Sequence, residues 1–247
     1  MVVTGAGTGI GRAIAQRLDA EGARLSLFAR DARRLRETAD GLTGEPCIAS
    51  CDIREPAAVE RAFEAAREQH GALYALVANA GVGGPNEAGS ADRFDELVDT
   101  NLRGSYLCAR AAQSRLAEGP GARHIVFVSS ILARIGVPGY TGYCASKAGL
   151  LGLTRALAAE LAPQEVQVNA LCPGWVDTSM AREGLEGMAA GMNISVEEAH
   201  AMAMQQVPLG RMSDPADVAG LVSWLLTSDA RGVTGQGLDM NGGAFMS

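Results

Sequence analysis

The sequence reads Thr4-Gly5-Ala6-Gly7-Thr8-Gly9-Ile10-Gly11 directly after the short apolar segment Met1-Val2-Val3. Glycines at this spacing permit a tight turn, close approach of a ligand to the backbone, and close packing of the following helix against a sheet. The free N–H groups of that helix, which we expect to begin near Ile10, would bind a pyrophosphate. Glycine-rich turns also occur without ligands, so the informative feature is the position at the first strand-to-helix junction.

Apolar runs that suit buried strands alternate with amphipathic stretches along the rest of the chain. The expected strands after the first are 24–29, 47–50, 73–78, 125–128, 167–171 and 237–240. The clearest helices are expected at 56–70, 143–161 and 214–228. The regular alternation, without internal repeats or low-complexity linkers, predicts an α/β fold with a doubly wound parallel sheet (Rossmann fold) in one domain, 1–247.

Composition limits the classes of protein to consider. A chain of 247 residues with 47% hydrophobic content suits one domain with a sizeable core. The net charge of -7 argues against nucleic acid or an anionic membrane as a partner. No apolar run approaches the roughly 20 residues of a membrane span, and no basic region followed by an apolar one opens the chain, so we expect a cytoplasmic protein.

Cysteine and histidine give no sign of a metal site or a disulfide framework. The five cysteines are odd in number and contain no C-x-x-C pair. Cys144 lies beside Tyr143, but no histidine is near it in sequence, and buried cysteine is usually a small hydrophobic residue. The three histidines are far apart in sequence, so we expect no metal.

The chemistry is expected where the run Val126-Phe127-Val128-Ser129-Ser130 is followed by Gly142-Tyr143-Cys144-Ala145-Ser146-Lys147. Tyr143 and Lys147 stand at i and i+4 of the expected helix 143–161 and therefore share one face. A nearby ammonium favours the phenolate and lowers the pKa of a tyrosine from about 10 toward neutrality. Tyr-x-x-x-Lys arises often by chance, but Lys147 is the only lysine among 21 basic residues, which favours a specific role for its compact ammonium.

Taken together, the motifs resemble those of the short-chain dehydrogenase/reductase family, nearly from end to end. The matching residues, in family order and spacing, are Thr4-Gly5-x-x-x-Gly9-x-Gly11, Asn79-Ala80-Gly81, Asn101, Ser130, Tyr143-x-x-x-Lys147 and Pro173-Gly174-x-x-x-Thr178. Two departures are Ala78, where many members carry a first asparagine, and the short first strand.

The resemblance implies an enzyme whose catalytic residues are Ser130, Tyr143, Lys147 and Asn101. Ser130 would hydrogen-bond the substrate oxygen and Tyr143 would transfer the proton. Lys147 would lower the pKa of Tyr143, bind the nicotinamide ribose and, with Asn101, hold a water relay. It further implies cofactor contacts from Gly5, Thr8, Gly9, Ile10, Gly11, Asp52, Ile53, Asn79, Gly81, Pro173, Gly174, Val176 and Thr178, besides Tyr143 and Lys147. Individually, Ser130 could end a strand, Asn101 could cap a helix and Thr178 could start one.

The choice of cofactor depends on the end of the second strand. An acidic residue there would accept hydrogen bonds from the ribose of NAD and repel the 2′-phosphate of NADP. The chain has Ala29 and then Arg30, with Arg33, Arg34 and Arg36 close behind. We assign Arg30 to the 2′-phosphate and Asp31 to the N-cap of the next helix, and expect at least two of the four arginines to be solvated. NADP(H) is therefore preferred, while a register error of one residue would favour NAD(H).

A nearer resemblance is to 3-oxoacyl-carrier-protein reductases and polyketide ketoreductases, through Cys172-Pro173-Gly174-Trp175-Val176-Asp177-Thr178 and Val207-Pro208-Leu209-Gly210-Arg211. It implies carbonyl reduction by an oxidoreductase that interconverts a ketone and a secondary alcohol. The identity of the substrate does not follow from this resemblance, and we expect a small apolar one. The alternatives are an NAD-dependent secondary-alcohol dehydrogenase and a non-catalytic nucleotide-binding sensor or scaffold, which the complete set of catalytic residues disfavours. An epimerase or dehydratase acting on nucleotide sugars is disfavoured because the chain lacks the extra C-terminal region of such relatives.

Two further expectations concern the region 179–206 and the oligomeric state. The region departs from the strand and helix pattern and holds five of the nine methionines, whose flexible side chains suit a substrate lid, although ordinary packing or a subunit contact would explain them as well. The helix 143–161 is apolar on most sides and needs cover on most sides, which favours a homo-oligomer. The resemblance implies a homotetramer.

Overall fold

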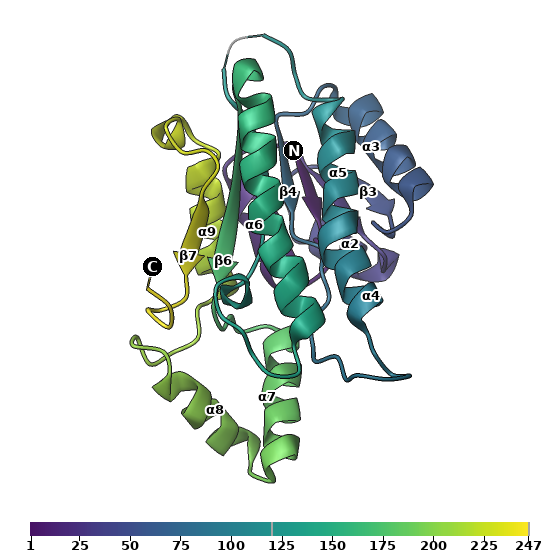
Figure 1. The fold of residues 1–247 in the computed structure, drawn as a ribbon. Coiled ribbons are helices and arrows are strands. Elements are labelled where there is room, and N and C mark those ends of the chain that lie inside the picture. Colours follow the sequence, from purple (N-terminus) through teal and green to yellow (C-terminus); the bar gives the residue numbers. More distant parts are fainter. Residues whose placement is uncertain (120, 247) are drawn as a thin grey trace.

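The computed structural model describes residues 1–119 and 121–246, which form a parallel sheet between two layers of helices (Figure 1). The strands are β1 Val2–Thr4, β2 Ser26–Ala29, β3 Cys47–Ser50, β4 Ala75–Ala78, β5 Arg123–Val128, β6 Val166–Pro173 and β7 Gly237–Met240. They pair in the order β3-β2-β1-β4-β5-β6-β7. The direction of winding reverses between β1 and β4, and open α/β sheets bind ligands beyond the carboxyl ends of the strands at such a switch point. The predicted doubly wound α/β fold is confirmed.

Helices cover both faces of the sheet. The α-helices are α1 Gly9–Ala20, α2 Ala32–Ala39, α3 Pro56–His70, α4 Phe94–Val98, α5 Ser105–Gln113, α6 Thr141–Leu161, α7 Ser179–Met192, α8 Val196–Gln205 and α9 Pro215–Leu225. One core cluster joins the sheet to α3, α5 and α6, and a second joins it to α1, α2 and α9. Figure 1 shows α5 and α6 lying across the sheet on the side that faces the viewer.

The central strands form because most of their residues are apolar and both faces of the sheet are covered. Every residue of β4, β5 and β6 is buried, as a parallel sheet covered on both sides requires. The register sets Val3 opposite Leu27 and Val77, and Phe127 opposite Ala170. The bounds predicted for β3, β7 and α3 agree with the structure, while α6 begins two residues earlier than expected.

The region 179–206, in which no regular pattern was predicted, forms the helices α7 and α8, joined by a tight turn beyond the carboxyl ends of the strands (Figure 1). Asn193 ends α7 in the left-handed conformation, with φ of 54°, and Ser195 and Glu198 form a capping box that starts α8. A small cluster of Leu185, Ala203, Met204 and Val207 holds the two helices together.

The five methionines of this region do not share one environment. Met204 is buried in the small cluster, Met188 is half-buried, and Met180, Met192 and Met202 are exposed. Among residues 1–119 and 121–246, no helix combines the length and the apolar composition that a bilayer span would need.

Candidate active site

The turn between β1 and α1 can be built only with glycine. Gly5 and Gly9 have φ angles of 66° and 52°, where other residues are strained. A Cβ on Gly11 would lie 2.2 Å from the carbonyl oxygen of Gly5. The side chain of Asn79 at the end of β4 donates through Nδ2 to the carbonyl oxygens of Thr4 (3.0 Å) and Gly5 (3.3 Å). Asn79 was expected beside the adenosine. In the structure its side chain instead stabilises the glycine turn by hydrogen bonds to the turn's backbone.

A cavity of about 170 Å³ lies at the switch point beyond this turn. Its lining residues are Gly5, Gly7, Thr8, Ala29, Arg30, Asp31, Arg34, Cys51, Asp52, Ile53, Ala80, Gly81, Val82 and Thr100. Six of the predicted cofactor residues are in this set: Gly5, Thr8, Arg30, Asp52, Ile53 and Gly81. The backbone of a glycine turn and two arginines in the lining suit an adenosine group that carries an extra phosphate.

Arg30 and Arg34 both line this cavity, whereas Arg33 and Arg36 do not. Arg33 forms an ion pair with Glu37, and Arg34 lies 3.5 Å from Asp31 Oδ2. Gly7 gives the room that Arg34 needs, since a Cβ on Gly7 would meet Arg34 Cβ at 3.0 Å. The sequence predicts that at least two of the four arginines are solvated without indicating which, and it does not predict that Arg34 lines the cavity.

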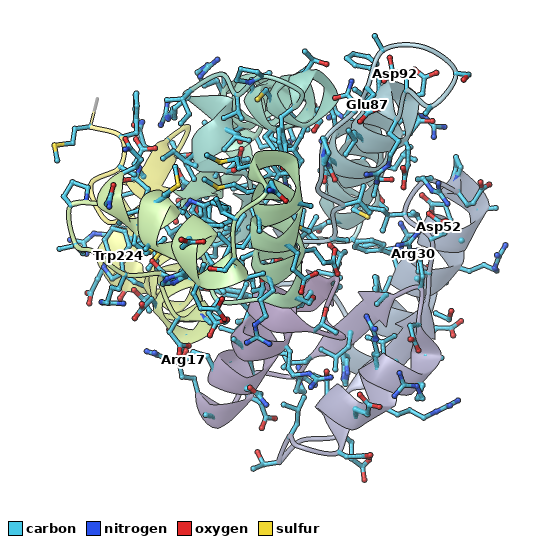
Figure 2. All side chains as sticks on the ribbon, turned by 90° about the horizontal axis from the view of Figure 1, so that it is seen from below. Arg17, Arg30, Asp52, Glu87, Asp92 and Trp224 are labelled. Atoms are coloured by element: carbon cyan, nitrogen blue, oxygen red, sulfur yellow. The ribbon has the colours of Figure 1, made fainter. Side chains whose placement is uncertain are left out.

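The two acidic residues that line the cavity, Asp31 and Asp52, are both engaged in hydrogen bonds within the protein. Asp31 is the N-cap of α2, as predicted, because its Oδ1 accepts from the backbone N–H groups of Arg33 and Arg34. The Arg54 guanidinium holds the pKa of Asp52 below its usual value, with a smaller contribution from the charge of Arg30. Figure 2, viewed from the end that carries α7 and α8, shows Arg30 and Asp52 close together at one side of the molecule.

Ser130, Tyr143 and Lys147 come together where β5 ends and α6 begins. Lys147 Nζ lies 5.6 Å from the centre of the Tyr143 ring and donates to the carbonyl oxygen of Val128 at 2.9 Å. The Ser129 hydroxyl donates to the carbonyl oxygen of Lys147 at 2.8 Å, which ties the helix to the strand end. Ser130 Oγ accepts from the N–H of Leu132 at 3.1 Å, so its own proton can be donated to the Tyr143 oxygen or to a substrate oxygen in front of it.

The predicted effect of Lys147 on Tyr143 is wrong for this structure. Burial raises the pKa of Tyr143, and the hydrogen bond with Ser130 offsets only part of that effect. Burial also lowers the pKa of Lys147 itself, to about 8. The ammonium donates to the backbone carbonyl of Val128 in β5, and desolvation is the largest cause of the pKa change in both groups.

Asn101 lies in a π-helical segment, Asp99–Gly104, between α4 and α5. Such segments are rare and often mark functional sites. The side chain of Asn101 bonds both backbone groups of Val82: Nδ2 donates to the carbonyl (2.9 Å) and Oδ1 accepts from the N–H (2.8 Å). It also donates to Ser146 Oγ at 3.1 Å, and Ser146 donates to the carbonyl of Tyr143. Asn101 therefore joins the loop after β4 to the helix of Tyr143.

The segment after β6 closes the other side of the site. Pro173 ends β6, and Gly174 packs against Asn241, whose Cα would lie 3.0 Å from an added Cβ. Thr178 caps α7 by accepting from the N–H of Ala181, as the alternative assignment expected. Its methyl carbon would lie 3.1 Å from a Cβ on Gly9, so Thr178 lies against the glycine turn. The structure thus brings Thr178, after β6, against the glycine turn near the start of the chain.

A larger cavity, of about 460 Å³, lies at the end of β7. Its lining residues are Leu209, Arg211, Ser213, Asp217, Asp239, Met240, Asn241, Gly242, Gly243 and Phe245. None of Ser130, Tyr143, Lys147 and Asn101 lines it. These four residues do not line the smaller cavity directly either, but its lining residue Gly81 is next to two of them: a Cβ on Gly81 would lie 2.9 Å from Asn101 Oδ1 and 3.5 Å from Lys147 Nζ. Size alone therefore does not mark the site, because the convergent polar groups are close to the smaller cavity. Among the described residues, no cluster of three or more histidine, cysteine or acidic side chains could hold a metal ion.

This geometry can be compared with that of known proteins. A family model described as enoyl-(acyl carrier protein) reductase matches residues 5–244. A Streptomyces violaceoruber protein described as granaticin polyketide synthase putative ketoacyl reductase 1 is 40% identical over 250 residues, covering 98% of this chain and 91% of the relative. The 3-oxoacyl-[acyl-carrier-protein] reductase MabA of Mycobacterium tuberculosis is 33% identical over 248 residues, covering 100% and 92%.

Solved structures show the same likeness. A variant of actinorhodin polyketide ketoreductase crystallised with NADPH matches with a TM-score of 0.91 and 35% identity, covering 98% of this chain and 95% of that one. Levodione reductase matches with a TM-score of 0.90 and 29% identity, covering 98% and 95%. The chain therefore belongs to the short-chain dehydrogenase/reductase family. It is an oxidoreductase of that family, as its motifs predicted.

Proposed function

We propose that this protein is an NADP(H)-dependent oxidoreductase that interconverts a small apolar ketone and the corresponding secondary alcohol. The observation that carries the proposal is the convergence of Ser130, Tyr143 and Lys147 near a cavity that two arginines border. The relatives support it, since they include ketoacyl reductases and a ketoreductase crystallised with NADPH.

The residues of the chain divide the reduction between them. A nicotinamide cofactor bound at this site would supply or accept the hydride. The Ser130 hydroxyl, already an acceptor for Leu132 N–H, donates its proton in a hydrogen bond to the substrate oxygen. Tyr143 delivers a proton to the same oxygen, for which a phenol kept protonated by burial is suited at neutral pH. Lys147 holds a positive charge near the ring, and this charge stabilises the phenolate that Tyr143 forms when it gives up its proton.

The cofactor preference rests on Arg30 and Arg34. Both border the cavity, and a guanidinium forms strong charge-assisted hydrogen bonds with a phosphate. Asp31 caps α2 with Oδ1, so one of its carboxylate oxygens is not available to a ribose hydroxyl. The remaining cofactor contacts are proposed as the sequence predicted them, with Asn79 acting through the glycine turn.

The decisive experiment is a screen of ketones of increasing size with NADPH and with NADH. The reaction is measured as the loss of reduced nicotinamide. We expect turnover of at least one ketone, with NADPH preferred. A preference for NADH would make the protein an NAD-dependent alcohol dehydrogenase. Tight binding of NADPH with no turnover of any ketone or alcohol would indicate the non-catalytic sensor.

The pair α7 and α8 is proposed as the substrate lid. Met180, near the start of α7, lies over the loop after β4: a Cβ on Gly83 would meet its sulfur at 2.9 Å. Met180 is also 42% exposed, which leaves its flexible side chain free to contact an apolar substrate. The other exposed methionines lie farther along the two helices and are not needed for this role.

A homotetramer in the cytoplasm is the proposed assembly and location. Small residues of α6, Ala148, Gly152, Ala156 and Ala159, lie on the side of the helix away from the sheet, and the three alanines are exposed in the single chain. Tyr106 on the neighbouring helix α5 is 40% exposed. A smooth helical face of this kind suits packing against a second copy. Light scattering at micromolar concentration should give the mass of four chains, and the mass of one chain would refute the assembly.

A further inference from the structure

The first turn of α6, which carries Tyr143, is capped by a side chain from a distant loop. The N-cap residue Tyr140 makes no side-chain hydrogen bond, so the helix leaves its first N–H groups to other partners. Asn86, in the loop after β4, accepts the N–H of Gly142 through Oδ1 at 2.8 Å. Gly142 directly precedes Tyr143.

Asn86 is held by contacts that fix the orientation of its amide. Its Nδ2 donates to Asp92 Oδ1 at 3.0 Å, and its Oδ1 accepts from an N–H that can only donate. Thr141 Oγ1 lies 2.9 Å from Nδ2 and 3.2 Å from Oδ1. The backbone N–H of Asn86 donates to the carbonyl of Gly139 at 2.8 Å. The side chain is 7% exposed, so these bonds are made away from bulk water.

The close approach depends on Gly142. A Cβ at this position would lie 3.1 Å from Phe94 Cα and from Leu97 Cδ1, and 3.3 Å from Asn86 Oδ1. The start of α6 is therefore packed directly against α4 and against the loop that contains Asn86. The same loop includes Gly83, beside Met180 of the proposed lid. One wall of the substrate side is thus bonded to the helix turn that carries the proton donor.

We infer that Asn86 is a positioning residue for Tyr143, which it aligns by capping α6 from the loop after β4. The inference rests on the proposed function, because it assigns Tyr143 the proton transfer. Loss of the cap would free the first turn of α6 and displace the phenol, and small displacements of a reacting group reduce the rate strongly. Cofactor binding, which takes place around the glycine turn, should not change.

The test is a double-mutant cycle of Asn86→Ala with Tyr143→Phe, measured as single-turnover hydride transfer from NADPH to a ketone that the wild type reduces. In the wild-type background, Asn86→Ala should slow hydride transfer by about tenfold and leave NADPH affinity within about twofold. In the Tyr143→Phe background the same change should have no further effect, since the group being positioned is gone. An equal loss in both backgrounds, or no loss in the wild type, would overturn the inference.

The exchange Asn86→Asp with Asp92→Asn gives a matched rescue. Residue 86 would still accept from Gly142, residue 92 would still accept from the N–H of Phe94, and the bond between them would run in the reverse direction. Hydride transfer should recover to within about threefold of the wild type. A folded exchange variant as slow as Asn86→Ala would contradict the role of the cap. Should Asn86→Ala not fold, Asn86→Leu, which keeps the side-chain size and also removes the acceptor for the Gly142 N–H, enters the same cycle. Absence of ketone reduction by the wild type would instead refute the proposed function.

Discussion

Lys147 Nζ lies 5.6 Å from the ring centre of Tyr143, yet its hydrogen bond goes to the carbonyl oxygen of Val128, at 2.9 Å. The ammonium is thus fixed by the sheet at the face of the ring, and its separation from water lowers its pKa to about 8. The two groups form one electrostatic unit in which a buried charge is kept close to the proton donor.

The low pKa of Lys147 predicts the alkaline limit of the reaction. The side chain is charged below about pH 8 and loses its charge as the pH rises through that value. Ketone reduction at saturating cofactor should therefore fall above about pH 8. Lys147→Arg, whose guanidinium stays charged, should be less active but should lose this decline. The same decline in both proteins would assign it to another group.

Arg30→Ala should weaken NADPH binding by about ten- to hundredfold and hardly change NADH, since a charge-assisted bond to phosphate contributes about 1.5–3 kcal/mol. The difference should shrink as salt is added, because part of it is a screened attraction. Arg34→Ala should give a smaller loss of the same kind. Arg33→Ala is the control, since Arg33 pairs with Glu37 and does not line the cavity. An equal loss of affinity for NADPH and NADH would show that Arg30 does not bind the 2′-phosphate.

Met180→Ala should raise KM for the larger ketones by about threefold to tenfold and leave NADPH affinity unchanged, because it removes an apolar contact on the substrate side only. Met192→Ala is the matched control, since Met192 is 48% exposed near the end of α7. Equal effects of the two changes, or none for Met180, would show that α7 does not cover the substrate.

Acid should destabilise the fold through His124. This side chain is 2% exposed, bonded to the Tyr74 hydroxyl at 3.1 Å, and burial lowers its pKa to about 4. The unfolded chain binds a proton near pH 6.5 and the folded chain does not, so the stabilisation is present above pH 6.5 and is lost as the pH falls toward 4. The free energy of unfolding should drop by up to about 3 kcal/mol over this interval.

Denaturant titrations at several pH values would measure this loss. His124→Asn should flatten the dependence, whereas His200→Asn, at an exposed position of α8, should not. A dependence that His124→Asn leaves unchanged would assign the acid sensitivity to other groups.

The sequence predicted the parts of the site that are local or repeated along the chain. Apolar runs placed β3, β5 and β7, and helical spacing placed Tyr143 and Lys147 on one face of α6. Asp31 was correctly predicted as a helix cap because the signal lies within three residues. The region 179–206 gave no such signal, since α7 and α8 lie beyond the sheet edge and pack mainly on each other.

Long-range relationships escaped prediction. Asn86 caps a helix that begins 55 residues later in the sequence, and Arg34 reaches the cavity because Gly7 leaves room for it. The effect of burial on Tyr143 depends on how many groups surround the phenol, which no local pattern encodes. Nor could sequence spacing show that the Asn79 side chain hydrogen-bonds to the backbone of the glycine turn.

The central claim, that Tyr143 transfers the proton, is tested most directly by Tyr143→Phe, which removes a single hydroxyl. Single-turnover hydride transfer from NADPH to a ketone should slow by about 10²- to 10⁴-fold, the usual contribution of a general acid, while NADPH affinity stays within about twofold of the wild type. Hydride transfer at the wild-type rate in the folded variant would contradict the account.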